Sequence, residues 1–94
     1  MQCPIISVPF ALGRVVATPN VLDAVSQDEI FDAIQRHQSC DWGDVNYQDK
    51  WSNDRAVKNG ERLLSVYYGK DGTKFWIITE ADRSATTVLL PEDY

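Results

Sequence analysis

The sequence is poor in the residues on which metal sites, disulfide frameworks and nucleophilic enzymes depend. It holds two cysteines, Cys3 and Cys40, and one histidine, His37. Two cysteines so far apart do not make a disulfide framework. A zinc site needs three or four protein ligands, and after His37 and Cys40 only Cys3 and carboxylates such as Asp41 remain to supply them. We therefore expect no metal, no cofactor and no Cys-His nucleophile pair.

The sequence also lacks the motifs of common nucleotide-dependent and hydrolytic enzymes. It contains no P-loop, no G-x-G-x-x-G, no G-x-S-x-G and no H-E-x-x-H. His37 is interpreted as a partly buried residue near the C-terminal end of a helix, where the helix dipole favours its charged form. With no catalytic residue identified, we expect a protein that is not an enzyme.

Long hydrophobic runs and an excess of positive charge are absent as well. The apolar stretches are far shorter than the ~20 residues that span a bilayer, and the N-terminus lacks the basic region and cleavage pattern of an export signal. Fourteen acidic residues against nine Lys and Arg give a net charge of −5, which argues against a duplex nucleic-acid partner. We expect a cytoplasmic protein with no membrane partner and no nucleic-acid partner, while a local basic patch stays open.

The apolar and aromatic residues suffice for one core. Of the 94 residues, 44% are hydrophobic, and they include three Trp, four Tyr and three Phe. A chain of this length builds a single domain, here residues 1–94. Residues 1–12 are expected to be irregular or to form an edge strand at 5–8, because Pro4 and Pro9 limit its pairing.

The first half of the chain predicts a short strand followed by helices. The run 13–17 favours a strand, and residues 18–19 (Thr-Pro) are typical of a helix start. Ser26 and Glu29 fit a capping box, after which apolar residues recur at helical spacing. A further helix is expected within 47–59. Its inward-facing residues are predicted to be Trp51, Ala56 and Val57.

The last third of the chain has the alternation and turns of a β-meander. Strands are expected at 62–68, 74–79 and 85–90, with a hairpin at Asp71-Gly72. The helices upstream can cover one face of this sheet. The predicted fold class is α+β: a three- to four-stranded antiparallel sheet packed by two or three helices, in the order β-α-α-β-β-β.

The string Asp41-Trp42-Gly43-Asp44 is the first candidate binding site. Two carboxylates flank an aromatic residue in a loop, and they could bind a cation or a basic residue of a partner, with Trp42 as an interface anchor. In the alternative, structural interpretation, which we favour, Asp41 and Asp44 form caps and turns while Trp42 fills the core.

The turn from Glu80 to Ser84 is the second candidate. Glu80, Asp82 and Arg83 at a rigid hairpin tip could present a charged epitope. The alternative, again favoured, is a plain solvated turn in which Arg83 pairs with Asp82 or Glu80, a contact that contributes little when exposed.

An aromatic cluster is expected across the first hairpin, from Tyr67, Tyr68, Phe75 and Trp76. Aromatic residues on a sheet can stack on bases, but cross-strand pairing for stability is the favoured interpretation. Alternate residues point to opposite faces, so one residue of each pair is expected at the surface. This would leave an apolar patch suited to dimerisation.

Five strings carry a family resemblance: Gly13–Pro19, Asp41–Asp44, Arg62–Tyr67, Trp76–Ser84 and Thr87–Pro91. From Gly13 to Tyr94 the chain resembles a group of short bacterial proteins labelled plasmid-related protein or type I restriction endonuclease subunit M. The resemblance implies no particular activity. A DNA methyltransferase needs an Asn-Pro-Pro-aromatic loop, which this sequence lacks.

Two functions follow as hypotheses. The first is a non-catalytic protein-binding, accessory or inhibitor protein, encoded on mobile or defence-related DNA, with a protein partner or as a homodimer. The second rests on the order β-α-α-β-β-β, which resembles that of RelE/ParE-type toxins. That resemblance implies a small RNA-acting toxin, with Arg83, Lys74 and Tyr68 as the residues to suspect.

Overall fold

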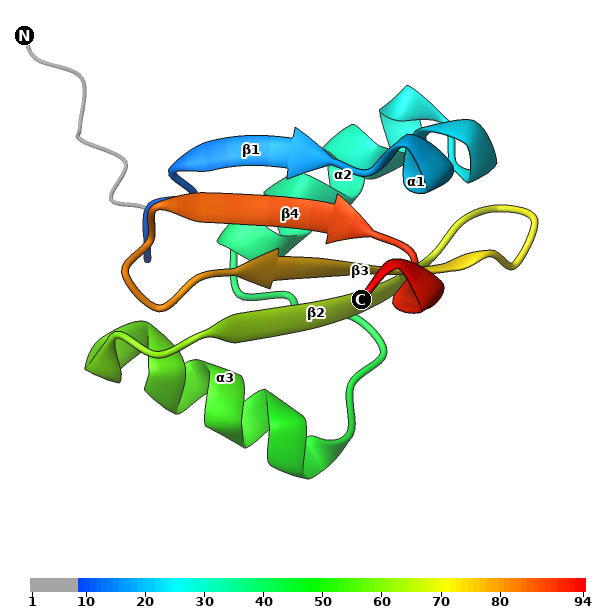
Figure 1. Ribbon diagram of the computed structural model, residues 1–94. Helices are drawn as coiled ribbons and strands as arrows, with labels where there is room; N and C mark the ends of the chain where they lie inside the picture. Colours follow the sequence, from blue (N-terminus) through cyan, green and yellow to red (C-terminus); the bar gives the residue numbers. More distant parts are fainter. Residues whose placement is uncertain (1–8) are drawn as a thin grey trace, which may run out of the picture.

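The computed structural model describes residues 9–94, so Cys3 and the edge strand expected at 5–8 lie outside the described part. Residues 9–12 belong to no helix or strand. The elements, drawn in Figure 1, are β1 (Arg14–Ala17), α1 (Pro19–Ala24), α2 (Gln27–Gln38), α3 (Tyr47–Asn59), β2 (Leu63–Tyr68), β3 (Lys74–Thr79), β4 (Ala85–Leu89) and the 3₁₀ turn η1 (Pro91–Asp93). The α+β class and the predicted element order are confirmed, with α1 as a short additional turn of helix.

The four strands form one sheet in the order β1-β4-β3-β2. The C-terminal strands make the expected antiparallel meander. The sheet is nevertheless mixed rather than wholly antiparallel, because β1 runs parallel to β4, with Arg14 opposite Ala85 and Ala17 opposite Val88. A strand that is joined to its neighbour through intervening helices is not forced antiparallel by a hairpin turn, and the sequence of β1 does not encode its direction.

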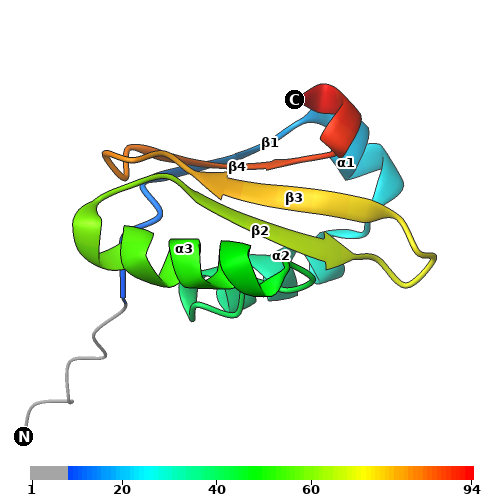
Figure 2. The same ribbon diagram turned by 90° about the horizontal axis from the view of Figure 1, so that it is seen from below.

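The helices cover only one face of this sheet. Figure 2 shows α2 and α3 on the same side, with the C-terminal turn on the other. Because side chains alternate along a strand, Phe75 and Ile77 of β3 point towards the helices and are buried. They share a core with Val21, Val25, Ile30, Ala33, Tyr67, Val88 and Leu90. A second, smaller cluster beneath α3 consists of Phe10, Trp42, Ala56 and Leu63.

The helix boundaries follow the capping signals in the sequence. The Ser26 Oγ accepts a hydrogen bond from the Glu29 N–H at 3.3 Å and donates to the Glu29 carboxylate at 2.9 Å. The Glu29 carboxylate also accepts from the Lys70 N–H, which ties the start of α2 to the β2–β3 hairpin. At the other end of the helical region, Gly60 ends α3 with a φ of 72°, a backbone conformation that glycine adopts at low cost.

The outer edge of β2 is closed by side-chain and loop contacts. The Asn53 amide of α3 donates to the Leu64 carbonyl at 2.7 Å and accepts from the Leu64 N–H at 3.2 Å. One step along the strand, the Val66 N–H donates to the Trp42 carbonyl at 3.0 Å, and the Asp44 N–H donates to the Val66 carbonyl at 2.8 Å. With these groups paired, this stretch of β2 is not a template for addition of another strand.

Asn53→Ala is expected to lower the free energy of unfolding by about 2 kcal/mol, because it removes two hydrogen bonds and leaves both polar groups of Leu64 without their partner. The exposed neighbour Ser52→Ala is the matched control, with an effect within about 0.5 kcal/mol. Urea unfolding of the two variants measures the difference. Equal midpoints would show that Asn53 does not hold α3 to the sheet edge.

Candidate functional site

The loop Asp41–Asp44 lies against the edge of β2 with its aromatic residue buried. Trp42 is 3% exposed. Its ring centroid lies 6.1 Å from that of Phe10 and 5.6 Å from that of His37. The Trp42 Nε1–H donates to the Asp54 carboxylate at 2.9 Å. Trp42 is therefore placed to fill the core rather than to offer its ring to a partner.

The other residues of this loop explain its unusual sequence. The Asp41 carboxylate accepts from the Arg36 guanidinium at 2.8 and 3.2 Å, and this pairing holds the pKa of Asp41 below its usual value. Gly43 has a φ of 75°, and a Cβ at this position would collide with the Val66 carbonyl. A side chain is excluded at Gly43, while Asp44 remains exposed.

The turn between β3 and β4 is organised by Arg83. Its guanidinium donates to the carbonyls of Glu61 at 2.6 Å, Ala56 at 2.8 Å and Glu80 at 3.1 Å. It also lies 5.6 Å from the centre of the Phe10 ring. Arg83 therefore connects the end of α3 to this turn through backbone carbonyls, whereas its expected alternative partners were the carboxylates of Asp82 and Glu80.

Arg83→Met is expected to lower the free energy of unfolding by about 1–2 kcal/mol, since it removes charge-assisted hydrogen bonds from a half-buried site but keeps the length of the side chain. The control is Asp82→Ala at the exposed tip of the same turn, expected to cost no more than about 1 kcal/mol. Thermal unfolding followed by circular dichroism compares them. A larger loss in the Asp82 variant would contradict this role of Arg83.

The two candidate loops approach each other at Phe10. Trp42 and Arg83 both lie against the ring of Phe10. The carboxylates of the four acidic candidates lie at exposed positions: Asp41, Asp44, Glu80 and Asp82. Within residues 9–94, no three His, Cys, Asp or Glu side chains lie close enough together to hold a metal ion.

His37 lies at the centre of a buried hydrogen-bond chain. The Thr86 hydroxyl donates to the Leu12 carbonyl at 2.7 Å, so its oxygen accepts from Thr79 Oγ1 at 2.8 Å. Thr79 Oγ1 therefore accepts from His37 Nε2 at 2.8 Å, and His37 Nδ1 accepts from Ser65 Oγ at 2.6 Å. Each hydroxyl has a single proton to donate, and a neutral imidazole has one N–H and one acceptor nitrogen. With Nε2 as the donor, His37 is the neutral Nε2–H tautomer.

The expectation of a charged, partly buried His37 is wrong. The residue is fully buried, and burial, together with the positive charge of Arg83, lowers its pKa to about 4. Both ring nitrogens are occupied by protein hydroxyls. In this arrangement His37 links α2 to strands β2 and β3 and has no surface with which to touch a substrate.

The face of the sheet turned away from the helices is apolar and is covered only in part, by η1 and Tyr94. Ile78 and Leu89 on this face are buried. Register and alternation place on it Val16, Leu64, Val66, Tyr68, Trp76, Ile78, Thr87 and Leu89. We call this surface the open face. Arg14 and Lys74 lie on it, and Arg62 lies just before β2 at its border. None of the strand residues is acidic.

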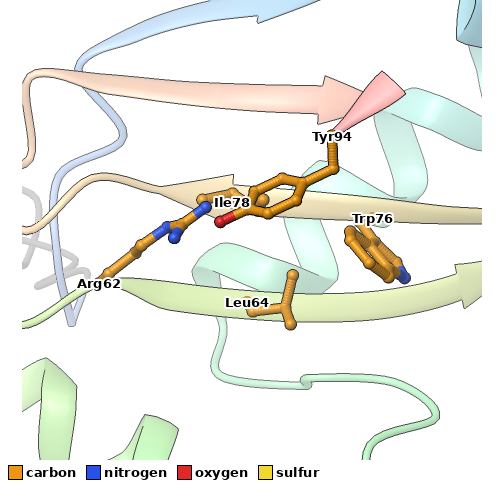
Figure 3. Close-up of a pocket in the computed structure, with 5 residues that line it drawn as sticks. All are labelled: Arg62, Leu64, Trp76, Ile78 and Tyr94. Atoms are coloured by element: carbon orange, nitrogen blue, oxygen red, sulfur yellow. The ribbon is translucent and has the colours of Figure 1, made fainter. Parts of the chain in front are cut away.

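A groove of about 280 Å³ crosses the open face. Figure 3 shows its lining residues: Arg62, Leu64, Trp76, Ile78 and Tyr94. The rings of Trp76 and Tyr94 meet edge to face with centroids 5.8 Å apart, and the Arg62 guanidinium lies 5.1 Å from the centre of the Tyr94 ring. This volume is slightly below the range of ~300–1,000 Å³ typical of small-molecule sites, and it suits one or two side chains of a partner.

Tyr94 is brought to this groove by η1. The Asp93 carboxylate accepts from the Thr18 hydroxyl and from the Asn20 amide, both at 2.7 Å. It also accepts from the Leu90 N–H at 3.2 Å. These three hydrogen bonds fix the turn that carries Tyr94 and hold the pKa of Asp93 below its usual value.

The sequence pattern predicted part of the open face. Tyr67 and Phe75 are buried against the helices, whereas Tyr68 and Trp76 lie on the open face, as the alternation predicts. The groove itself was missed. Its signal was the second apolar series in the meander, in which Leu64 and Ile78 pair across the strands on the face away from the helices.

A second exposed aromatic site lies on α3. Trp51 is 54% exposed and Tyr47 is 86% exposed. The prediction that Trp51 faces inward is therefore wrong, whereas Ala56 is buried as expected. The inward face of α3 is set by Asn53 and Ala56, and Trp51 lies about 200° around the helix from Asn53. The Arg55 guanidinium stacks 4.8 Å from the centre of the Trp51 ring.

Comparison of the chain with protein-family models, with curated proteins and with solved structures finds no match. In the part of the chain that the structure describes, no helix has the length and apolar character needed to cross a membrane.

Proposed function

We propose that this chain is a non-catalytic protein-binding module, acting as an accessory or inhibitor protein, and that it binds its partner through the open face. The observation that carries the proposal is a sheet with apolar residues on both sides, packed by α2 and α3 on one side and covered only in part by η1 and Tyr94 on the other. An antiparallel sheet with one solvated face normally alternates apolar and polar residues. Here β2 and β3 present Leu64, Val66, Tyr68 and Trp76, all at least partly exposed, on the side away from the helices, and contiguous apolar surface of this kind is typical of interaction sites.

The polar residues of the open face fit binding better than catalysis. Arg62, Lys74 and Tyr68 lie there without a carboxylate or imidazole from the strands that could act as their base. The residues implied by the toxin resemblance do not converge. Tyr68 and Lys74 form a cross-strand pair at one end of β3, whereas Arg83 is bound to backbone carbonyls beyond its other end.

The proposal also includes the origin of the gene and the cellular location of the protein. The family resemblance supports an origin on mobile or defence-related DNA, and the two cysteines, too few for a disulfide framework, support a cytoplasmic location. A protein partner encoded by the same host or element is then expected.

Affinity purification from the native host, quantified by mass spectrometry, tests the proposal with a matched pair of variants. Trp76→Ala alters the open face, and Trp51→Ala removes the same side chain from the exposed surface of α3. We expect one stoichiometric partner with the wild-type chain and with Trp51→Ala, and loss of that partner with Trp76→Ala. Loss with Trp51→Ala alone would move the interface to α3.

A further inference from the structure

We infer that the partner segment that occupies the open face is acidic and amphipathic: one apolar side chain enters the groove, and a neighbouring carboxylate pairs with Arg62. This inference rests on the proposed function and specifies the chemistry of the partner. It follows from the shape of the groove, from the charges around it and from the absence of Arg62 from the ion pairs of the described residues.

The shape of the groove selects one large apolar side chain. Leu64 and Ile78, a cross-strand pair, form its base. Trp76 and Tyr94 bound it from above the strands, as Figure 3 shows. A lining of aliphatic and aromatic residues with one polar group at its border favours an apolar anchor from the partner, of the kind that dominates interface energies.

The one charged side chain that lines the groove, Arg62, is a cation, although the molecule as a whole is acidic. The net charge is −5, yet the strands contain no acidic residue. Arg14, Arg62 and Lys74 lie on or beside this face. Acidic residues border the same face: Glu80, which follows β3 opposite Arg62, and Glu92 and Asp93 of η1. The Asp93 carboxylate is already bound to Thr18, Asn20 and Leu90. At physiological salt the Debye length is about 8 Å, so the charge that a segment in the groove meets first is that of Arg62.

Arg62 is available to a carboxylate from outside. Among residues 9–94 the side-chain ion pairs are Arg36–Asp41 and Lys50–Asp54, and neither includes a cation of the open face. Stacking on the Tyr94 ring orients the Arg62 guanidinium at the groove. A planar guanidinium held in this way can bind a carboxylate through two parallel hydrogen bonds.

A second copy of the chain fits this surface less well. A symmetric dimer through two open faces uses the same patch on both subunits, and the groove has no acidic lining residue that could pair with the partner's Arg62. Pairing through the edge of β2 is blocked by Asn53 and by the loop that contains Trp42. A base-stacking platform for single-stranded nucleic acid also fits less well, because the Tyr94 ring is already in contact with Arg62 and Trp76.

The test uses the full chain and a displayed library of random peptides. Selected peptides are expected to combine one Leu, Met, Phe or Trp with an Asp or Glu within four residues, as on one face of a helix. Synthetic copies are then measured by fluorescence polarisation. Arg62→Gln in the protein and replacement of the peptide's Asp or Glu by Asn or Gln should each weaken binding about tenfold. The two changes together should weaken binding little further, since they remove the same contact. Binding should also weaken as salt is raised.

The outcomes separate this inference from the proposed function. Peptides that lose affinity with Trp76→Ala but bind Arg62→Gln unchanged would overturn the acidic partner and leave the open face as the binding site. Peptides that bind Trp76→Ala as tightly as wild type would overturn both. No enrichment, a concentration-dependent dimer that Arg62→Gln abolishes, or tight binding of single-stranded oligouridylate instead of peptide would each overturn the acidic-peptide assignment.

Discussion

Replacement of Phe75 by alanine is expected to lower the free energy of unfolding by about 3–5 kcal/mol, while replacement of its neighbour Trp76 lowers it by only about 1–2 kcal/mol. Phe75 is 1% exposed in the main core, where its loss leaves a cavity between the sheet and the helices. Trp76 lies on the open face, where water fills the space of the missing ring. For a small domain with a total stability of about 5–15 kcal/mol, the first change approaches the limit of folding.

Chemical unfolding of the two variants, with wild type, measures this contrast. A milder substitution, Phe75→Leu, keeps the comparison informative if the alanine variant does not fold, and is expected to cost about 1–2 kcal/mol. Equal destabilisation by Phe75→Ala and Trp76→Ala would mean that Trp76 is buried in the folded protein, contrary to the assignment of its surface to a partner.

Acidification from pH 6.5 to pH 4 is expected to remove up to about 3 kcal/mol of stability through His37 alone. Its pKa is about 4 in the folded protein, against an ordinary value of 6.5. The folded state therefore disfavours the proton that the unfolded chain binds. The contribution is fully present above pH 6.5, declines as the pH falls through this interval, and changes no further below pH 4.

The aspartates with lowered pKa values affect the stability of the fold in a lower pH interval than His37. Asp41, Asp54 and Asp93 have pKa values below the ordinary 3.8, so their protonation destabilises the fold only below about pH 4. The sequence contains one histidine, so its NMR resonance is unambiguous and should titrate near pH 4. A midpoint near 6.5 would show that the His37 ring is accessible to water and would contradict the buried hydrogen-bond chain.

Much of the fold could be predicted from local signals. The capping residues at Thr18 and Ser26 and the glycine at 60 fixed helix ends that the structure reproduces within about one residue. The alternation in β2 and β3 also predicted that one member of each aromatic pair lies at the surface, as Tyr68 and Trp76 do. These features depend on neighbours in the sequence, which a pattern records directly.

The remaining features depend on contacts between distant residues. The parallel pairing of β1 with β4, the buried partners of His37 and the position of Tyr94 over the groove each join residues far apart in the chain. Trp51 was misplaced because an aromatic residue was taken for a core residue, whereas Asn53 occupies the inward position and bonds to the edge of β2. A polar residue in that place has no signal in an apolar pattern.

The most direct test of the central claim uses the three tryptophans, which report on three different parts of the molecule. Trp42 is in the core, Trp51 on the exposed surface of α3 and Trp76 on the open face. Fluorotryptophan-labelled protein, with each resonance assigned by a Trp→Phe variant, is titrated with the partner recovered from the host. Binding through the open face predicts a shift of the Trp76 resonance at stoichiometric partner, with Trp51 unchanged. A shift of Trp51 with Trp76 unchanged would contradict it.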